Sequence, residues 1–172
     1  MISGSWKEKR PILHIPLSPM EIALEIIAAL GMVFSFFIII QVWPILPDTI
    51  PTHFGASGKV DGWGGKESLF ILPVINIFLL YIPITFLSRY PHIFNYLWPI
   101  TEQNAQAQYY NARLMLGWIK AEIVGLSAII SWRTIQTALG KTEGLGSMFL
   151  FLILLVLFGT MGISMCKSYQ AR

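Results

Sequence analysis

The chain has 172 residues, of which 55% are hydrophobic and 12% are charged, and its formal net charge is +3. A charged fraction well below the roughly 25% of soluble domains indicates an integral membrane protein rather than a soluble domain with a large core. The basic cluster at Lys7, Lys9 and Arg10 is small and adjoins the first apolar segment, so we expect no nucleic-acid partner. Cys166 is the single cysteine, which excludes an intrachain disulfide.

The first predicted helix covers residues 19–43, after a tail at residues 1–18 on the membrane surface. Ser18 and Glu21 have the spacing of a capping box, and Pro19 suits the first helical position. No charge occurs in the 22 positions from 26 to 47. At about 1.5 Å per residue, such a segment is roughly 33 Å long, which is enough to cross the hydrocarbon core of a bilayer.

The next elements are a long loop, residues 44–67, and a second helix, residues 68–88. Pro73 and Pro83 lie inside this helix, and membrane-spanning helices tolerate prolines where neighbouring groups satisfy the freed backbone. We expect a kink near one of them. Asn76 is the polar residue within this helix, and we interpret it as an interhelical hydrogen-bonding group.

Two further helices are predicted at residues 102–139 and 145–166. The short polar turn between them places them antiparallel. The predicted fold class is therefore an all-α integral membrane protein: a single domain at residues 19–172 that forms an up-down bundle of four transmembrane helices in the lipid bilayer. One long, ordered extracytoplasmic loop joins the first two helices.

The distribution of basic residues predicts the orientation of this bundle. Eight of the 12 lysines and arginines lie on the side of both termini and four on the side of the first loop. Because basic residues accumulate on the cytoplasmic side of membrane proteins, we expect cytoplasmic N- and C-termini and an external first loop.

Lys120 and Glu122 are charged residues within the third predicted helix. They are two positions apart and therefore point to different faces. We interpret both as interfacial, with Lys120 extending to the cytoplasmic headgroups. The alternative is a buried proton or ion site, since a charge placed in hydrocarbon is costly and typical of function. Asn76, Lys120 and Glu122 are thus the candidate intramembrane polar residues.

The first loop combines prolines in its first half with glycines in its second half. Pro47 and Pro51 prevent the first helix from continuing, whereas Gly58 and Gly62 permit tight turns. Trp63 is suited to the outer membrane interface. Loops of about two dozen residues without regular structure tend to be functional. We therefore expect this loop to be ordered, to pack on the bundle and to be the functional element.

The residues of this loop resemble a known signature. The matching stretches are Leu46-Pro47-Asp48, Ile50-Pro51-Thr52-His53-Phe54, Gly58, and Asp61-Gly62-Trp63-Gly64 with Lys66. They resemble the domain of unknown function numbered 1648, which occurs in small bacterial membrane proteins and in immunity proteins of the SdpI type. The wider resemblance covers roughly residues 20–90, and SdpI-type proteins are longer than this chain.

This resemblance implies a multi-pass protein of the bacterial inner membrane without an assigned reaction. The implied roles are envelope protection, sensing of an extracellular peptide, or support of a larger membrane assembly. The candidate binding residues are Pro47, Asp48, Pro51, His53, Phe54, Gly58, Asp61, Gly62, Trp63 and Lys66. No catalytic residue and no cofactor are predicted.

A divalent metal is the alternative ligand of the loop. One imidazole and two carboxylates, from His53, Asp48 and Asp61, form a ligand set that such ions accept, although the spacing matches no closed zinc pattern. The competing interpretation is that these side chains hydrogen-bond to hold the loop in shape. A metal-dependent membrane enzyme or transporter, with Glu122 as a further group, is therefore one alternative function. A small accessory subunit of a larger membrane complex is another.

Overall fold

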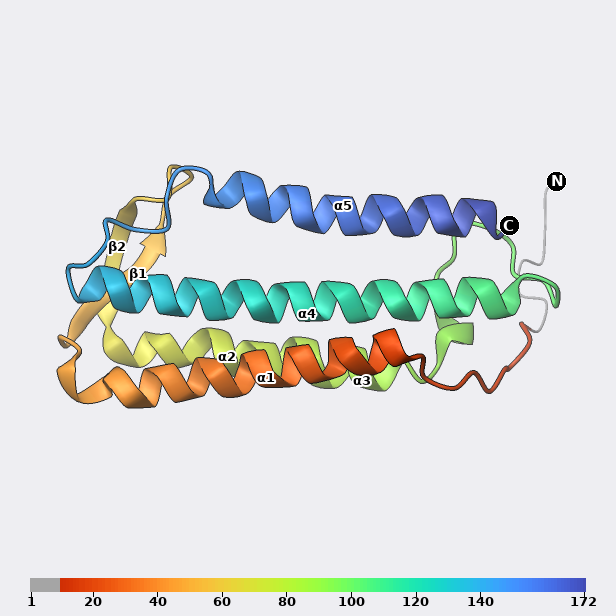
Figure 1. Cartoon of the computed structure of the whole chain (residues 1–172), viewed down its shortest axis with the longest axis horizontal. Coiled ribbons are helices and arrows are strands. Elements are labelled where there is room, and N and C mark those ends of the chain that lie inside the picture. Colours follow the sequence, from red (N-terminus) through yellow and green to blue (C-terminus); the bar gives the residue numbers. More distant parts are fainter. Residues whose placement is uncertain (1–9) are drawn as a thin grey trace, which may run out of the picture.

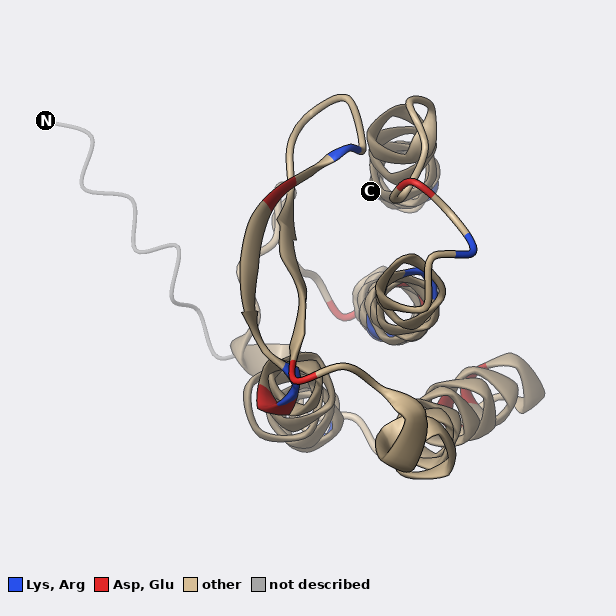
Figure 2. Cartoon of the chain, turned by 90° about the vertical axis from the view of Figure 1, so that its left-hand side faces the viewer, with Lys and Arg blue, Asp and Glu red and all other residues tan. Residues whose placement is uncertain are grey.

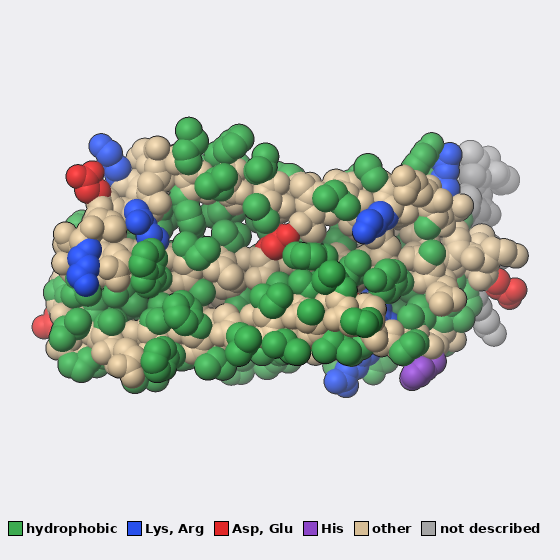
Figure 3. All heavy atoms as spheres, in the orientation of Figure 1, with side chains coloured by type: hydrophobic (Ala, Val, Ile, Leu, Met, Phe, Trp, Pro, Cys, Tyr) green, Lys and Arg blue, Asp and Glu red, His purple; other side chains and the backbone are tan. Residues whose placement is uncertain are grey.

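The structure is a computed structural model that describes residues 10–172, so residues 1–9 of the predicted tail lie outside it. Its long helices lie side by side along one axis (Figure 1). Four helical segments are long and apolar enough to cross a membrane: Pro19–Ile45, Lys66–Leu87, Ala105–Ala138 and Phe149–Gln170. Hydrophobic side chains cover most of the surface along the middle of the molecule (Figure 3). Charged side chains are more frequent at its two ends. The chain is therefore a helical, multi-pass membrane protein.

Helix α1 (Pro19–Val42) begins with the predicted capping box. The Ser18 hydroxyl accepts a hydrogen bond from the Glu21 amide at 3.2 Å, and the Glu21 carboxylate accepts one from the Ser18 amide at 2.8 Å. A 3-10 turn, η1 (Trp43–Ile45), ends the span. Pro44 lies in this turn, where its missing amide N–H removes an α-helical hydrogen bond.

The second span is irregular along its length. It consists of η2 (Lys66–Phe70), α2 (Ile71–Ile75), the π-helical segment η3 (Asn76–Tyr81) and α3 (Ile82–Leu87). The segment between Pro73 and Pro83 is π-helical, while the predicted kink stays a prediction. Each proline removes one backbone hydrogen bond, and a wider turn accommodates its ring. Asn76 is buried at the start of the segment.

Helix α4 (Ala105–Ala138) is the centre of the bundle (Figure 2). It runs in the same direction as α1, because Leu24 lies against Gly117 near one end and Gly31 lies against Val124 further along both helices. Small residues at such contacts let two helix backbones approach closely, which is the usual basis of helix packing in membranes.

Helix α5 (Phe149–Gln170) runs antiparallel to α4. Polar contacts join the two near the C-terminus of the chain: the Gln108 amide donates to the Ser168 carbonyl at 2.8 Å, and the Asn111 amide donates to the Ser164 carbonyl at 2.9 Å. Most other side chains of α5 are exposed and apolar, as expected for a surface that faces lipid.

The predicted helical class with four spans is confirmed, but the loop at residues 44–67 differs from the prediction, because it contains a small two-stranded sheet. Residues Thr49–Phe54 form strand β1 and residues Val60–Gly65 form strand β2, which pair antiparallel. This hairpin lies at the end of the bundle opposite the C-terminus and extends from the end of α1 toward the start of α5 (Figures 1 and 2). The strands were not predicted because the segment contains many prolines and glycines, and both residue types are depleted in strands.

The connection between α4 and α5 packs on the tip of this hairpin. The Leu145 amide donates to the Gly58 carbonyl at 2.8 Å, and Lys59 and Gly144 form an isolated antiparallel bridge. Residues 145–148 were predicted to be helical, but they make this contact, so α5 begins at Phe149. Because of this tertiary contact, helix α5 begins four residues later in the sequence than predicted.

We predict that Gly58→Ala destabilises the protein by about 2 kcal/mol or more. Gly58 has a φ of +75°, and an added Cβ would lie 2.3 Å from the Gly146 carbonyl oxygen. Thermal unfolding in detergent, followed by tryptophan fluorescence, should show a lower midpoint. Gly159→Ala is the control, because nothing lies within 4 Å of its added Cβ. Equal midpoints for the two variants would contradict the docking of the hairpin tip.

Candidate functional site

The hairpin is anchored to the bundle by two consecutive buried side chains of β1, Ile50 and Pro51. Ile50 is fully buried in a cluster at the end of the bundle. The other buried members of this cluster come from α1, α4 and the segments that flank the hairpin: Ile39, Leu46, Leu69 and Ile135. An isolated two-stranded hairpin is marginally stable in water, so this burial supports the sheet.

The base of the hairpin is closed by Asp48 and Lys66. The Lys66 amide donates to the Asp48 carbonyl at 3.0 Å, and its Nζ lies 3.1 Å from Asp48 Oδ1. The same ammonium group lies 5.2 Å from the centre of the Trp43 ring, within cation–π range. Because the Asp48 side chain is almost fully exposed, the ion pair itself contributes little and positions Lys66 rather than stabilising the fold.

The outward face of the hairpin carries a pair of polar side chains and one aromatic ring. His53 Nδ1 lies 2.5 Å from Asp61 Oδ1 across the two strands, and these side chains are 73% and 51% exposed. Trp63 is 59% exposed on the same strand as Asp61. These three residues form what we call the outer cluster: His53, Asp61 and Trp63.

The glycines of β2 make room for the side chains of β1. A Cβ on Gly62 would lie 2.9 Å from the His53 Cβ, and one on Gly64 would lie 3.0 Å from the Thr52 Cγ2. The alternation of glycine with Asp61 and Trp63 therefore has a steric cause. It lets β1 and β2 approach closely while the larger side chains of β2 face outward.

The structure separates the three residues that were considered as metal ligands. His53 and Asp61 contact each other, but Asp48 lies at the base of the hairpin beside Lys66. Within residues 10–172 no group of three or more histidine, cysteine or acidic side chains is placed to hold a metal ion. Metal binding by the hairpin stays a prediction, and only His53 and Asp61 of the three proposed ligands lie close enough together to bind one ion.

Lys120 is buried between helices, so its side chain does not extend along the protein surface as the snorkelling interpretation expected. Its side chain is 1% exposed and forms an ion pair with Glu25 of α1. Its Nζ also donates to the Thr85 hydroxyl at 2.8 Å and lies 4.7 Å from the centre of the Tyr81 ring. Burial is possible because three neighbouring elements supply a carboxylate, a hydroxyl and an aromatic face.

A second buried ion pair lies one to two turns closer to the start of α1 and α4. Arg113 Nη2 lies 2.7 Å from Glu21 Oε1, and both side chains are buried. Arg113 Nη1 also donates to the Ile15 carbonyl at 2.8 Å, which ties the segment before α1 to the bundle. A cavity of about 520 Å³ adjoins both pairs, and Glu25 and Arg113 form part of its wall.

Sequence reasoning missed these two pairs, although a signal was present. Glu21 and Glu25 are four residues apart, and Arg113 and Lys120 are seven residues apart, so each couple lies on one face of its helix. Two acidic and two basic residues on single helix faces could have suggested that these faces meet.

Glu122 has surroundings unlike those of the other acidic residues in the spans. The Thr160 hydroxyl of α5 donates to its Oε1, while its Oε2 is buried without a hydrogen-bond partner among the described residues. Glu122 therefore faces α5, away from the ion pair of Lys120.

Comparison with known proteins supports the resemblance found in the sequence. Residues 30–77 match the family model described as "Domain of unknown function (DUF1648)", so the chain carries this domain over part of α1, the hairpin and the start of the second span. An uncharacterized protein of the archaeon Archaeoglobus fulgidus is 40% identical over 57 residues, which is 29% of this chain and 31% of that protein. No solved structure matches. The SdpI-type relationship and the bacterial location stay predictions.

We predict that Glu25→Gln destabilises the protein more than Lys120→Met does. Glu25→Gln leaves a fully buried ammonium group without a counter-charge, and breaking a buried pair in this way costs about 3–5 kcal/mol. In Lys120→Met the remaining carboxylate is 31% exposed and faces the cavity. Thermal unfolding should also show the double variant to be more stable than Glu25→Gln alone. Strictly additive losses would mean that the two side chains do not interact.

Proposed function

We propose that this chain is a non-enzymatic membrane protein whose hairpin, residues 46–66, recognises an extended peptide segment of an external partner. The observation that carries this proposal is the two-stranded sheet, because within residues 10–172 no third strand pairs with β1 or β2, and only Lys59, just before β2, is bridged to Gly144. Exposed sheet edges bind extended peptides by strand addition, in which main-chain hydrogen bonds supply affinity and side chains supply specificity.

The edge of β2 is the better candidate for this interaction. β1 is the strand that contacts α4 and inserts Ile50 into the core. β2 alternates between exposed and half-buried positions along its whole length. The edge of β2 is therefore the one that an additional strand could reach with the least rearrangement.

The hairpin is also held in one conformation before any partner binds. Its base is joined by the backbone hydrogen bond from the Lys66 amide to the Asp48 carbonyl, and its tip is held by the hydrogen bond from the Leu145 amide to the Gly58 carbonyl. A surface that is ordered in advance loses less conformational entropy on binding. This rigidity favours a recognition surface over a flexible linker.

The outer cluster supplies chemistry for specificity. Exposed tryptophans are frequent anchors of protein interfaces, and Trp63 stands beside the polar pair of His53 and Asp61. A partner that combines an apolar side chain with a hydrogen-bonding group fits this surface. Support of a membrane assembly and sensing of a peptide would both use such a contact.

The distribution of charge supports an external position for the hairpin. Arg10, Arg89, Arg113, Lys167 and Arg172 belong to segments at the end of the bundle that carries the C-terminus. The segments at the hairpin end contain four basic residues: Lys59, Lys66, Arg133 and Lys141. Over the full sequence the count is eight basic residues on the side of the termini against four on the side of the hairpin, and by the positive-inside rule this excess supports a hairpin outside the cytoplasm.

We predict that Ser57→Cys, in a Cys166→Ser background, reacts with a membrane-impermeant maleimide in intact cells. Ser57 is exposed in the turn of the hairpin, so labelling depends on the side of the membrane on which it lies. Gln103→Cys, an exposed position at the other end of the bundle, should react only after permeabilisation. The reverse pattern would invert the topology.

We predict that Trp63→Ala weakens peptide binding at least tenfold, which is the loss expected for an interface anchor worth about 2 kcal/mol. The probes are decapeptides selected from a random displayed library on the protein in lipid nanodiscs, and their affinities are measured by biolayer interferometry. Trp132→Ala is the matched control, since Trp132 is similarly exposed but lies on α4. Failure to select any peptide, or equal binding to both variants, would refute the proposed recognition.

A further inference from the structure

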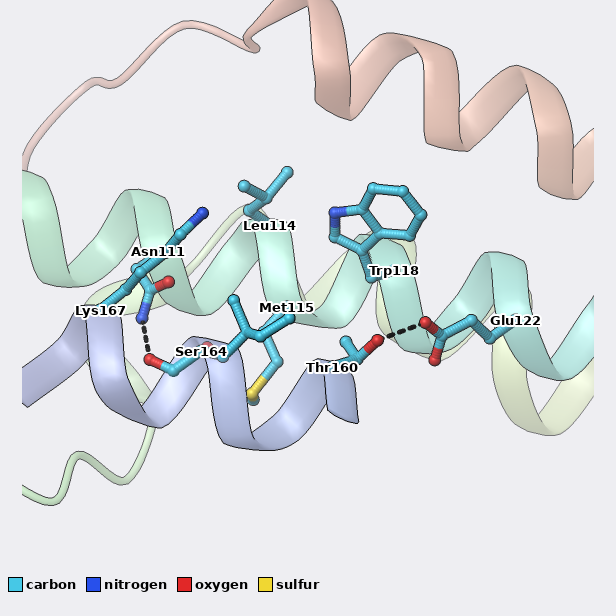
Figure 4. Close-up of a pocket in the computed structure, with 9 residues that line it drawn as sticks. Asn111, Leu114, Met115, Trp118, Glu122, Thr160, Ser164 and Lys167 are labelled. Carbon is cyan, nitrogen blue, oxygen red and sulfur yellow. Dashed lines mark hydrogen bonds between the residues drawn. The ribbon is translucent and has the colours of Figure 1, made fainter. Parts of the chain in front are cut away.

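Glu122 stands at one end of a pocket between α4 and α5 (Figure 4). The Thr160 hydroxyl donates to its Oε1, but the buried Oε2 has no partner among residues 10–172. A buried carboxylate oxygen without a hydrogen-bond donor is costly in free energy, so this oxygen is suited to receive a donor from a bound molecule.

The charge of Glu122 is also unbalanced. Glu21 and Glu25 form ion pairs with Arg113 and Lys120, whereas Glu122 has no ion-pair partner in the described chain. Its position on the spanning helix α4 raises the cost of a lone negative charge further. A ligand that brings a positive charge would satisfy both the unpaired oxygen and the charge.

The pocket beside Glu122 has the size and walls of a site for a small organic molecule. Its volume is about 290 Å³, near the lower limit of the roughly 300–1,000 Å³ that is typical of ligand pockets. Apolar side chains form much of its wall, including Leu114, Met115 and Ile163. Trp118 precedes Glu122 by one helical turn, and indole rings attract cations.

We propose that this pocket binds a small organic amine in its protonated form. The ammonium group donates a hydrogen bond to Glu122 Oε2, and the alkyl or aromatic body of the amine lies against Trp118 and the apolar wall. A bare metal ion fits less well, because Glu122 and Thr160 supply few oxygen ligands and no metal-binding group of acidic, histidine or cysteine side chains occurs in residues 10–172.

The opposite end of the pocket carries a positive charge. The proposal can therefore be tested by whether removal of this charge strengthens or weakens binding of the amine. Lys167 lies beside Ser164 and Asn111, away from Glu122 (Figure 4). Its ammonium group repels a bound cation through the pocket. Removal of the Lys167 charge should therefore act in the direction opposite to removal of the Glu122 charge.

We predict that phenethylammonium binds saturably to the full chain in lipid nanodiscs at pH 7, as measured by isothermal titration calorimetry. Glu122→Gln, which preserves side-chain shape, should weaken binding at least tenfold. Lys167→Gln should raise the affinity a few-fold. Glu102→Gln, at an exposed position outside the pocket, should have no effect. Neutral 2-phenylethanol should not compete at the same concentration.

Carbodiimide labelling tests the same site without a substitution. Dicyclohexylcarbodiimide reacts with carboxyl groups in apolar surroundings, and mass spectrometry of the wild-type chain should locate its adduct at Glu122. Phenethylammonium should reduce this labelling. If the amine does not protect Glu122 from labelling, it does not bind at this carboxyl group and the proposal is overturned. Equal amine binding by Glu122→Gln and the wild-type chain would also overturn it. Effective competition by 2-phenylethanol would do the same.

Discussion

The parallel packing of α1 on α4 is the constraint on which the rest of the structure depends. Near one end, Glu21 and Glu25 pair with Arg113 and Lys120, and a charge left unpaired between spanning helices would be costly. These pairs fix the register of the two helices. At the other end the same register brings Ile39 and Ile135 together, which creates the cluster that receives the hairpin.

The hairpin is consequently a rigid extension of the bundle. Ile50 enters the cluster formed by α1 and α4, while the connection before α5 holds the hairpin tip. The glycines opposite Thr52 and His53 keep the two strands close and leave the outer cluster exposed. The hairpin at one end of the bundle and the largely apolar pocket beside Glu122 further along it are thus both supported by α4.

Sequence patterns predicted the spans well, because each depends on local properties. Twenty-two uncharged positions after Glu25 require a spanning helix, and the capping box at Ser18 sets its start. The hairpin was missed because its strands contain prolines and glycines that usually mark irregular loops. The candidate site residues could be chosen because they cluster in the sequence. That Asp48 lies apart from His53 in space could not be predicted from the sequence.

The sequence alone therefore determined that this is a membrane protein of four spans with one distinctive segment between the first two, since hydropathy and helix capping act over short distances. The tertiary structure decided which charges are paired and which remain free. Lys120 and Glu122 are two residues apart and looked equivalent, yet Lys120 meets Glu25 and Glu122 faces a pocket beside α5. The reason is geometric: residues two positions apart lie on nearly opposite faces of a helix, these faces meet different neighbours, and only the packing of the helices assigns those neighbours.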